Sequence, residues 1–356
     1  MSFRFHVSYS IDFSHMKIGI LSSGGDCPGI NATIRGVGKT AVNHFGMDVI
    51  GLYDGFQGLF NNNFISLDDK SLSGLLNLGG TILGTSREKP FKKLLETNSI
   101  SKPQIIVDNY NRLGLDCLVC IGGNGAQKTA YKLFLLGLNV IGIPKTIDND
   151  VYGTDFSFGF HTAVDIATDA IDRLHSTASS HKRVMVIELM GHKAGWITLF
   201  AGMAGGADVI LLPELGCDMN KVYKTINNRI KKDKPYSIVA VAEGLELESN
   251  GNCGHGLASK LSRLIENNTG IETRETILGY VQRGGSPSAF DRNLATLLGG
   301  HATELVSKGK FGRMVALIKD KITSVPLEKV AGKLKLVTPN HDLITQGKRI
   351  GISFGI

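Results

Sequence analysis

The sequence predicts an α/β fold built from mostly parallel sheets. Short apolar runs alternate with stretches of helical periodicity along most of the chain, which is the order that βαβ units require. These apolar runs end at glycine or at small groups of polar residues. The chain has 44 glycines against 9 prolines, a rich supply of tight turns. Its 356 residues are enough for two domains.

The predicted elements follow one another in a regular order of strand, turn and helix. The expected strands cover residues 17–21, 117–121, 140–143, 183–188, 209–212 and 238–242. The expected helices cover residues 31–44, 126–136 and 160–178.

The composition indicates a folded protein with a large core, since 42% of the residues are hydrophobic and 20% are charged. No apolar run is long enough to span a bilayer, so we expect no membrane partner. The net charge of +7 favours anionic partners. Because the cations are scattered and aromatic residues make up only 7%, we expect a phosphorylated small molecule and no nucleic acid.

The cysteines indicate a protein of the reducing cytoplasm. There are five, and an odd number argues against a disulfide scaffold. Cys117 and Cys120 lie inside the apolar run 115–121, so we expect core thiols there, and a redox pair or metal half-site is the weaker alternative. Residues 1–15 lack the apolar core of a secretion signal, and we expect an unstructured leader before Met16.

Residues 143–150 carry the strongest chemical signal in the chain. They read Ile143-Pro144-Lys145-Thr146-Ile147-Asp148-Asn149-Asp150 and directly follow a predicted strand. In an extended segment alternate residues point the same way, so both aspartates can reach one small volume. One carboxylate then serves as a base and the other lies near a cation, while the lysine suits a highly anionic substrate.

Three glycine-rich segments are candidates for phosphate binding. Residues 24–29 and 122–125 each follow a predicted strand, where glycine N–H groups and the next helix can approach a phosphate. Residues 79–87 end in hydroxyls and Arg87. A tight turn that needs glycine is the alternative in each case. Neither a dinucleotide fingerprint nor a Walker A motif is present, which makes an oxidoreductase the least favoured class.

Because ligands of parallel α/β sheets bind beyond the carboxyl ends of the strands, the polar groups at these ends predict one composite site. Taken in order, they resemble the motifs of the 6-phosphofructokinase family. The matching segments are Gly24-Gly25-Asp26-Cys27-Pro28-Gly29-Ile30-Asn31-Ala32, Gly122-Gly123-Asn124-Gly125, Pro144-Lys145-Thr146-Ile147-Asp148-Asn149-Asp150, Met190-Gly191-His192, Ala242-Glu243-Gly244 and Gly279-Tyr280-Val281-Gln282-Arg283-Gly284-Gly285-Ser286-Pro287.

The resemblance covers nearly the whole chain from Met16 on and implies the phosphofructokinase fold, with two Rossmann-like three-layer domains. Residues 16–159 plus 284–332 form a larger donor-binding domain by this resemblance. Residues 160–283 plus 333–356 form a smaller sugar-phosphate-binding domain. The implied reaction is phosphorylation of fructose 6-phosphate at its 1-hydroxyl by ATP with Mg²⁺, the committing step of glycolysis.

The resemblance also implies roles for individual residues. Asp148 is the general base, with Thr146 and Lys145 beside it in the catalytic set, and Asn124 and Asp150 hold Mg²⁺. The substrate-binding set is Thr146, Asp150, Arg183, Met190, Gly191, His192, Glu243, Arg274, Tyr280 and Arg283. The donor-binding set is Gly25, Arg87, Gly123, Asn124, Gly125 and Ala126. In the family, the positions of Arg183 and Arg274 come from a neighbouring subunit, which implies a homo-oligomer, either a tetramer or a dimer.

The chain departs from the usual family pattern at three positions. Asn124 stands where an aspartate is usual, and a hard cation prefers a charged oxygen. His192, followed by Lys193, stands where an arginine is frequent. Tyr280 replaces a histidine of many bacterial members.

The phosphoryl donor follows from two further positions. Diphosphate users of the family have an aspartate at Gly125, where it fills the place of the nucleotide's α-phosphate. Lys145 is shared with those users and also with some ATP users. An aspartate at residue 125 would exclude a nucleotide sterically, whereas a lysine at residue 145 is compatible with either donor. Because this chain has glycine at residue 125, we predict ATP as the phosphoryl donor. The alternatives are a diphosphate-dependent enzyme, a kinase for another sugar phosphate or nucleoside, and a non-catalytic regulatory or ligand-binding paralogue.

Overall fold

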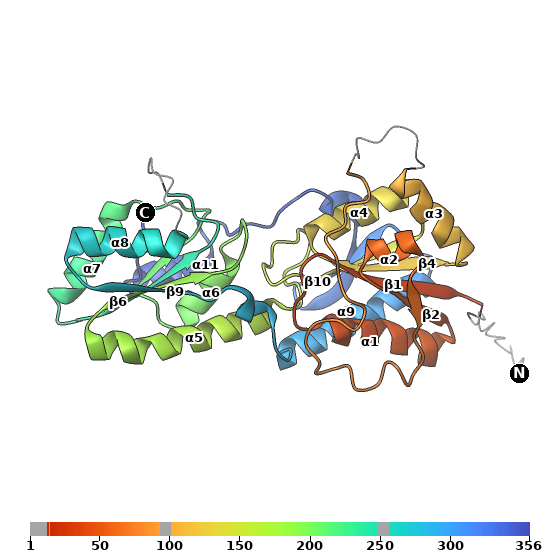
Figure 1. The fold of residues 1–356 in the computed structure, drawn as a ribbon, viewed down its shortest axis with the longest axis horizontal. Coiled ribbons are helices and arrows are strands. Elements are labelled where there is room, and N and C mark those ends of the chain that lie inside the picture. Colours follow the sequence, from red (N-terminus) through yellow and green to blue (C-terminus); the bar gives the residue numbers. More distant parts are fainter. Residues whose placement is uncertain (1–12, 14, 93–100, 248–255) are drawn as a thin grey trace, which may run out of the picture.

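The computed structural model describes residues 13, 15–92, 101–247 and 256–356. Within these residues the chain forms two α/β units side by side, each a sheet with helices on both faces (Figure 1). The predicted α/β class with mostly parallel sheets is confirmed. The predicted leader falls on residues 1–12 and 14, which lie outside the described residues. Phe13 packs edge-on against Phe45, with 5.5 Å between the ring centroids.

The larger sheet has the strand order β11-β10-β5-β4-β1-β2-β3. Its strands are β1 (Lys17–Ser23), β2 (Asp48–Leu52), β3 (Phe64–Ser66), β4 (Cys117–Gly122), β5 (Val140–Pro144), β10 (Arg313–Ile318) and β11 (Lys321–Pro326). The inner strands run parallel, and the edge strands β3 and β11 pair antiparallel with their neighbours.

Helices cover both faces of this larger sheet (Figure 1). One face packs against α1 (Ile30–Thr40) and α9 (Ala289–Ser307), and the other faces α2 (Phe56–Asn61), α3 (Lys102–Arg112), α4 (Asn124–Leu135) and α10 (Leu327–Val330). Strand β4 shows why its sequence is a continuous apolar run. Cys117 and Val119 pack on the first face, whereas Leu118 and Cys120 pack on the second. Both cysteines are free and fully buried, as predicted.

The smaller sheet is wholly parallel, with the order β7-β8-β6-β9. Its strands are β6 (Val184–Leu189), β7 (Val209–Leu211), β8 (Ser237–Ala242) and β9 (Thr273–Ile277). One face packs against α5 (Phe160–His181) and α6 (Trp196–Ala204), and the other against α7 (Met219–Ile230) and α8 (Leu257–Thr269). Helix α11 (Asp342–Arg349) lies beside α6.

The chain passes between the two units three times. It enters the smaller unit along α5, returns through the 3₁₀-helix η2 (Gly279–Arg283), and crosses back after α10 toward α11. Several chain crossings therefore join the two units. The helix predicted at 31–44 ends as an α-helix at Thr40 and continues as one π-helical turn, Ala41–Phe45. Among the described residues, no helix has both the length and the apolar character of a membrane span.

Candidate active site

A cleft of about 740 Å³ lies where the carboxyl ends of the larger sheet face loops of the smaller unit. It brings together segments that follow β1, β4, β5, β6 and β8. The predicted site residues that line it are Gly25, Arg87, Gly123, Asn124, Gly125, Ala126, Lys145, Thr146, Asp148, Asp150, His192, Glu243 and Arg283.

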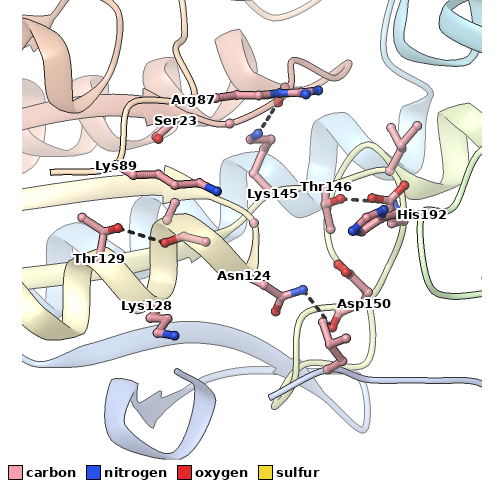
Figure 2. Close-up of a pocket in the computed structure, with 18 of the residues that line it drawn as sticks. Ser23, Arg87, Lys89, Asn124, Lys128, Thr129, Lys145, Thr146, Asp150 and His192 are labelled. Atoms are coloured by element: carbon pink, nitrogen blue, oxygen red, sulfur yellow. Dashed lines mark hydrogen bonds between the residues drawn. The ribbon is translucent and has the colours of Figure 1, made fainter. Parts of the chain in front are cut away.

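The first glycine turn is held by the segment that ends at Arg87. Gly24 has φ 97°, in the left-handed region that favours glycine. Its N–H donates to the Ser86 carbonyl at 2.9 Å, and its own carbonyl accepts from Thr85 Oγ1 at 2.8 Å. These bonds place the exposed side chain of Arg87 on the cleft wall near the turn (Figure 2).

Lys145 connects the carboxylate loop, residues 145–150, to the same glycine turn. The residue is only 2% exposed, and its Nζ donates to the carbonyl oxygen of Gly25. Burial lowers the pKa of this ammonium. The side chain therefore brings a basic group up to the glycines that line the cleft.

The second glycine turn forms the start of helix α4. Gly123 is the N-cap, and no described side chain caps the first N–H groups of the helix. The positive end of the helix dipole therefore lies at the cleft wall, an arrangement that favours anions. A Cβ added at Gly125 would meet no described atom within 4 Å, so the cleft is open beside this residue.

Asp148 and Asp150 both line the cleft, but their segment is not extended as predicted. After β5 the chain turns at residues 147–148, where the Asp148 N–H donates to Thr146 Oγ1 at 3.1 Å. Asn149 follows in the left-handed region, at φ 50°. The extended prediction was wrong because a threonine hydroxyl and an asparagine stabilise a turn here.

The environment raises the pKa of both carboxyls. Burial, followed by the nearby charge of Asp150, raises the pKa of Asp148 to about 6. Burial also raises the pKa of Asp150, which is 6% exposed. A carboxyl with a pKa near 6 is ionised at neutral pH and is a stronger base than an ordinary aspartate, which suits general-base catalysis.

Asn124 and Asp150 offer oxygens that fit a divalent cation. Asn124 Nδ2 donates to the Asp150 carbonyl at 3.3 Å (Figure 2). Asn124 Oδ1 is buried and has no hydrogen-bond partner among the described residues. No group of three or more histidine, cysteine or acidic side chains suited to a metal occurs in the described chain. An amide oxygen and a carboxylate are ligand types that suit Mg²⁺, which usually takes one or two carboxylates together with substrate phosphates and water.

The smaller unit contributes a loop fixed by Glu243. The N–H groups of Gly191 and His192 donate to Glu243 Oε1 at 3.2 and 2.8 Å. His192 and Glu243 are exposed and line the cleft. Gly191 is buried beside them, and Met190 packs partly against the core, so neither lines the cleft.

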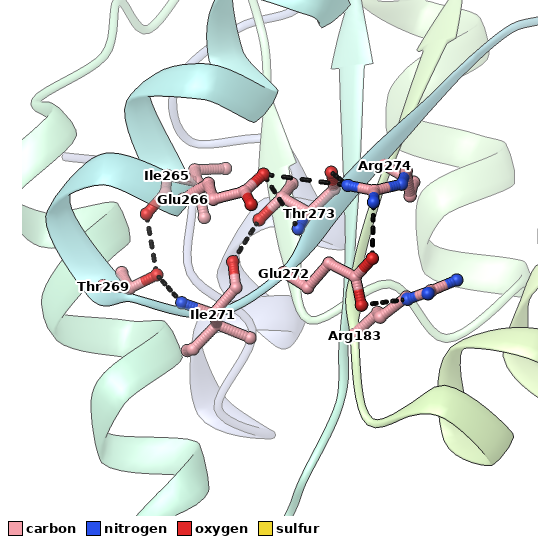
Figure 3. Close-up of polar contacts among 8 residues, drawn as sticks. All are labelled: Arg183, Ile265, Glu266, Thr269, Ile271, Glu272, Thr273 and Arg274. Carbon is pink, nitrogen blue, oxygen red and sulfur yellow. Dashed lines mark hydrogen bonds and ion pairs between the residues drawn. The ribbon is translucent and has the colours of Figure 1, made fainter.

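Arg183 and Arg274 lie away from this cleft, at the amino end of β6 (Figure 3). Arg183 Nε contacts Glu272 Oε2 at 2.6 Å, and Arg274 pairs with the other oxygen of the same carboxylate. Tyr280 is 76% exposed and also lies outside the cleft lining, with the Arg283 guanidinium 5.4 Å from its ring centroid.

Four further lysines, which the sequence did not single out, line the cleft from the segment after Arg87 and from α4: Lys89, Lys92, Lys128 and Lys132. Lys128 and Lys132 follow Asn124 at intervals of four on α4, so they share one helix face. Lys132 Nζ lies 4.9 Å from the ring centroid of Phe91. This spacing of four residues from Asn124 could have predicted that Lys128 and Lys132 lie on the same helix face as Asn124.

Two α/β units with mostly parallel sheets enclose glycine turns, basic side chains and paired carboxylates. This combination defines a phosphate-binding protein with acid–base groups, as phosphotransferases have. The family model described as Phosphofructokinase matches residues 17–306. The chain belongs to the phosphofructokinase family.

Individual relatives agree with this assignment. ATP-dependent 6-phosphofructokinase 3 of Bacteroides thetaiotaomicron is 65% identical over 340 residues, which cover 96% of this chain and 100% of that protein. Pyrophosphate--fructose 6-phosphate 1-phosphotransferase of Streptomyces coelicolor is 45% identical over 354 residues, 96% of this chain and 100% of that protein. The solved phosphofructokinase of Saccharomyces cerevisiae superposes with a TM-score of 0.79 at 31% identity. That match covers 88% of this chain but only 45% of the yeast chain.

Proposed function

We propose that this chain transfers the γ-phosphoryl group of ATP to the 1-hydroxyl of fructose 6-phosphate, giving fructose 1,6-bisphosphate and ADP in the committing step of glycolysis. One observation carries the proposal. Asp148, a carboxyl whose pKa is raised to about 6, lies in one cleft with two glycine turns and Lys145. The ATP-dependent relative at 65% identity supports the same reaction.

Asp148 is the general base in this proposal. It takes the proton of the sugar's 1-hydroxyl as that oxygen attacks the phosphorus, and such a base contributes roughly 100- to 10,000-fold. Thr146 accepts the N–H of Asp148 and so fixes the turn that carries it. Lys145 and Arg87, with the backbone of Gly25, Gly123, Gly125 and Ala126, orient the donor phosphates and balance their charge.

Asp150 and Asn124 are the residues that would hold Mg²⁺. When bound, the ion neutralises the negative charge of the donor phosphates. The orphaned Asn124 Oδ1 supports this assignment, since a cation supplies the partner that the described residues do not. Asp150 is then the one charged ligand, because Asn124 has no charge.

Arg283, Glu243 and His192 are assigned to the sugar phosphate, since all three line the cleft from segments that follow strands of the smaller unit. Thr146 and Asp150 line the cleft as well and belong to this set. Met190, Gly191 and Tyr280 complete the proposed set, although they lie outside the cleft lining. Arg183 and Arg274 lie outside the cleft of their own chain. In the proposed function they bind a sugar phosphate in the cleft of a second copy. The functional form we propose is therefore a homo-oligomer, either a tetramer or a dimer.

ATP is the proposed donor because the cleft is open beside Gly125. Diphosphate is the second candidate. Lys145 and the Streptomyces coelicolor relative favour it, since that protein is named for pyrophosphate. We give Gly125 more weight, because the space beside it would hold the part of a nucleotide that diphosphate lacks.

The two units divide the substrates between them in this proposal. Residues 16–159 plus 284–332 bind the donor, and residues 160–283 plus 333–356 bind the sugar phosphate. We also propose a cytoplasmic location, which the free state of the four described cysteines supports.

The test uses purified protein, fructose 6-phosphate and Mg²⁺, with ATP or diphosphate supplied in turn. We expect fructose 1,6-bisphosphate with ATP and little or none with diphosphate. A higher rate with diphosphate would reverse the donor assignment. Binding of both substrates without turnover would make the chain a regulatory paralogue.

A further inference from the structure

Lys335 lies in the segment that crosses from the larger unit to the smaller one, and it contacts the carboxylate loop. Its Nζ donates to Asn149 Oδ1 at 2.8 Å, to the Thr154 carbonyl at 3.0 Å and to the Asp155 carbonyl at 2.6 Å. An ammonium has three hydrogens, so these three acceptors use all of them. The side chain is thus fully engaged by residues 149–155.

Asn149 stands between the two cleft carboxylates and is only 1% exposed. Its φ of 50° lies in the left-handed region, and its Oδ1 also accepts the Ser157 N–H at 3.1 Å. The Ser157 hydroxyl in turn donates to the Thr146 carbonyl at 2.8 Å. The asparagine side chain is therefore the point at which Lys335 holds the turn that carries Asp148.

The backbone of Lys335 connects this loop to the smaller unit. Its N–H donates to the Asp150 carbonyl at 2.8 Å, and its carbonyl accepts the Trp196 Nε1–H at 2.8 Å. Trp196 is the first residue of α6. Two residues on, the Val337 N–H donates to Glu214 Oε1 at 2.9 Å. The segment is thus fixed on the smaller unit while it supports the loop.

We propose that Lys335 is a positioning residue for phosphoryl transfer, which through Asn149 holds Asp148 and Asp150 in their reactive orientation. This inference rests on the proposed function. The described lining of the cleft does not include Lys335, so it acts through the loop and touches no substrate. A misplacement of about 1 Å costs roughly 100-fold in rate. The effect is therefore expected on kcat more than on substrate binding.

The first test is Lys335→Met, which keeps an unbranched side chain of similar length. It removes the ammonium, with its three hydrogen bonds and its contact 5.4 Å from the Trp196 ring centroid. We expect kcat to fall about 10- to 100-fold while KM for each substrate changes less than about threefold. The matched control is Lys333→Met in the same segment. Lys333 is exposed, and its ammonium lies 5.3 Å from the Tyr152 ring centroid. The control should keep the wild-type kcat.

The second test is Asn149→Gly, which tolerates the positive φ and removes Oδ1. If Lys335 acts through Asn149, the double variant has a kcat close to that of the poorer single variant. An unchanged kcat in folded Lys335→Met, a loss confined to KM, or multiplied losses in the double variant would overturn the inference. Should Lys335→Met fail to fold by thermal melting, an unchanged kcat in folded Asn149→Gly overturns it equally. An absence of kinase activity in the wild-type protein would instead contradict the proposed function.

Discussion

The guanidinium of Arg283 lies against the backbone of Gly25, so closely that a Cβ added at residue 25 would stand 2.5 Å from Arg283 Nη1. The glycine belongs to the turn after β1, and the arginine ends η2. In the proposed function this contact joins the donor side of the cleft to the sugar-phosphate side. Arg283 Nε is buried and has no hydrogen-bond partner in the described part of the chain.

Gly25→Ala should displace Arg283 and so lower kcat/KM for fructose 6-phosphate about 100-fold, because the new methyl group occupies the place of the guanidinium. Steady-state kinetics at saturating ATP measures the effect. The control is Gly300→Ala within α9, where a Cβ meets only Thr40 Oγ1 at 3.5 Å. It should leave kinetics unchanged and stabilise the fold by up to about 1 kcal/mol. Wild-type kinetics in Gly25→Ala would refute the proposed role of the contact.

The pKa of about 6 at Asp148 sets the expected pH dependence. Above this pH the carboxyl is ionised and accepts the hydroxyl proton. Below it the carboxyl is protonated, so kcat/KM should fall about tenfold per pH unit. Initial rates between about pH 5 and pH 8 test this, with melting curves to show that the protein stays folded. A rate that does not decline toward pH 5 would exclude a base with this pKa.

Gly125→Asp should reduce the use of ATP without unfolding the protein. The added carboxylate has room in the cleft, since a Cβ at this position meets no described atom within 4 Å. Its charge would face the donor phosphates, and opposing like charges cost several kcal/mol. We expect kcat/KM for ATP to fall at least about 100-fold, while diphosphate is affected less. An equal effect on both donors would remove Gly125 as a donor determinant.

Asn124→Asp should strengthen metal binding. The substitution replaces a neutral amide oxygen beside Asp150 with a charged one, which a hard cation prefers. We expect the half-saturating Mg²⁺ concentration to fall, measured as activity against free Mg²⁺ at fixed ATP. An unchanged or higher requirement would show that Asn124 does not contact the ion.

Much of the fold follows from local patterns in the sequence. Strands such as β4 are buried on both faces, so an uninterrupted apolar run predicts them. Turn glycines mark the strand ends, and a parallel sheet places these ends along one edge. The turn at Asp148 was missed although Thr146 and Asn149 are local turn residues that stabilise it. Ser157 and Lys335, which lie farther along the chain, add support through the Asn149 side chain.

The rest of the site depends on contacts between distant segments. Lys335 is 186 positions from Asn149 in the sequence, and no local spacing connects the two. Lys89 and Lys92 are ordinary surface lysines by pattern, and only the fold places them on the cleft wall. The contact of Arg283 with Gly25 likewise appears only when the loop after β9 meets the turn after β1.

The most direct measurement compares kcat of Asp148→Asn with that of the wild type, using fructose 6-phosphate and Mg-ATP, alongside equilibrium binding of both substrates. The variant is nearly isosteric but has no carboxylate to accept a proton. We predict a fall in kcat of roughly 100- to 10,000-fold with binding of both substrates retained. A kcat within about threefold of the wild type would show that Asp148 does not accept the proton and would contradict its proposed role as general base.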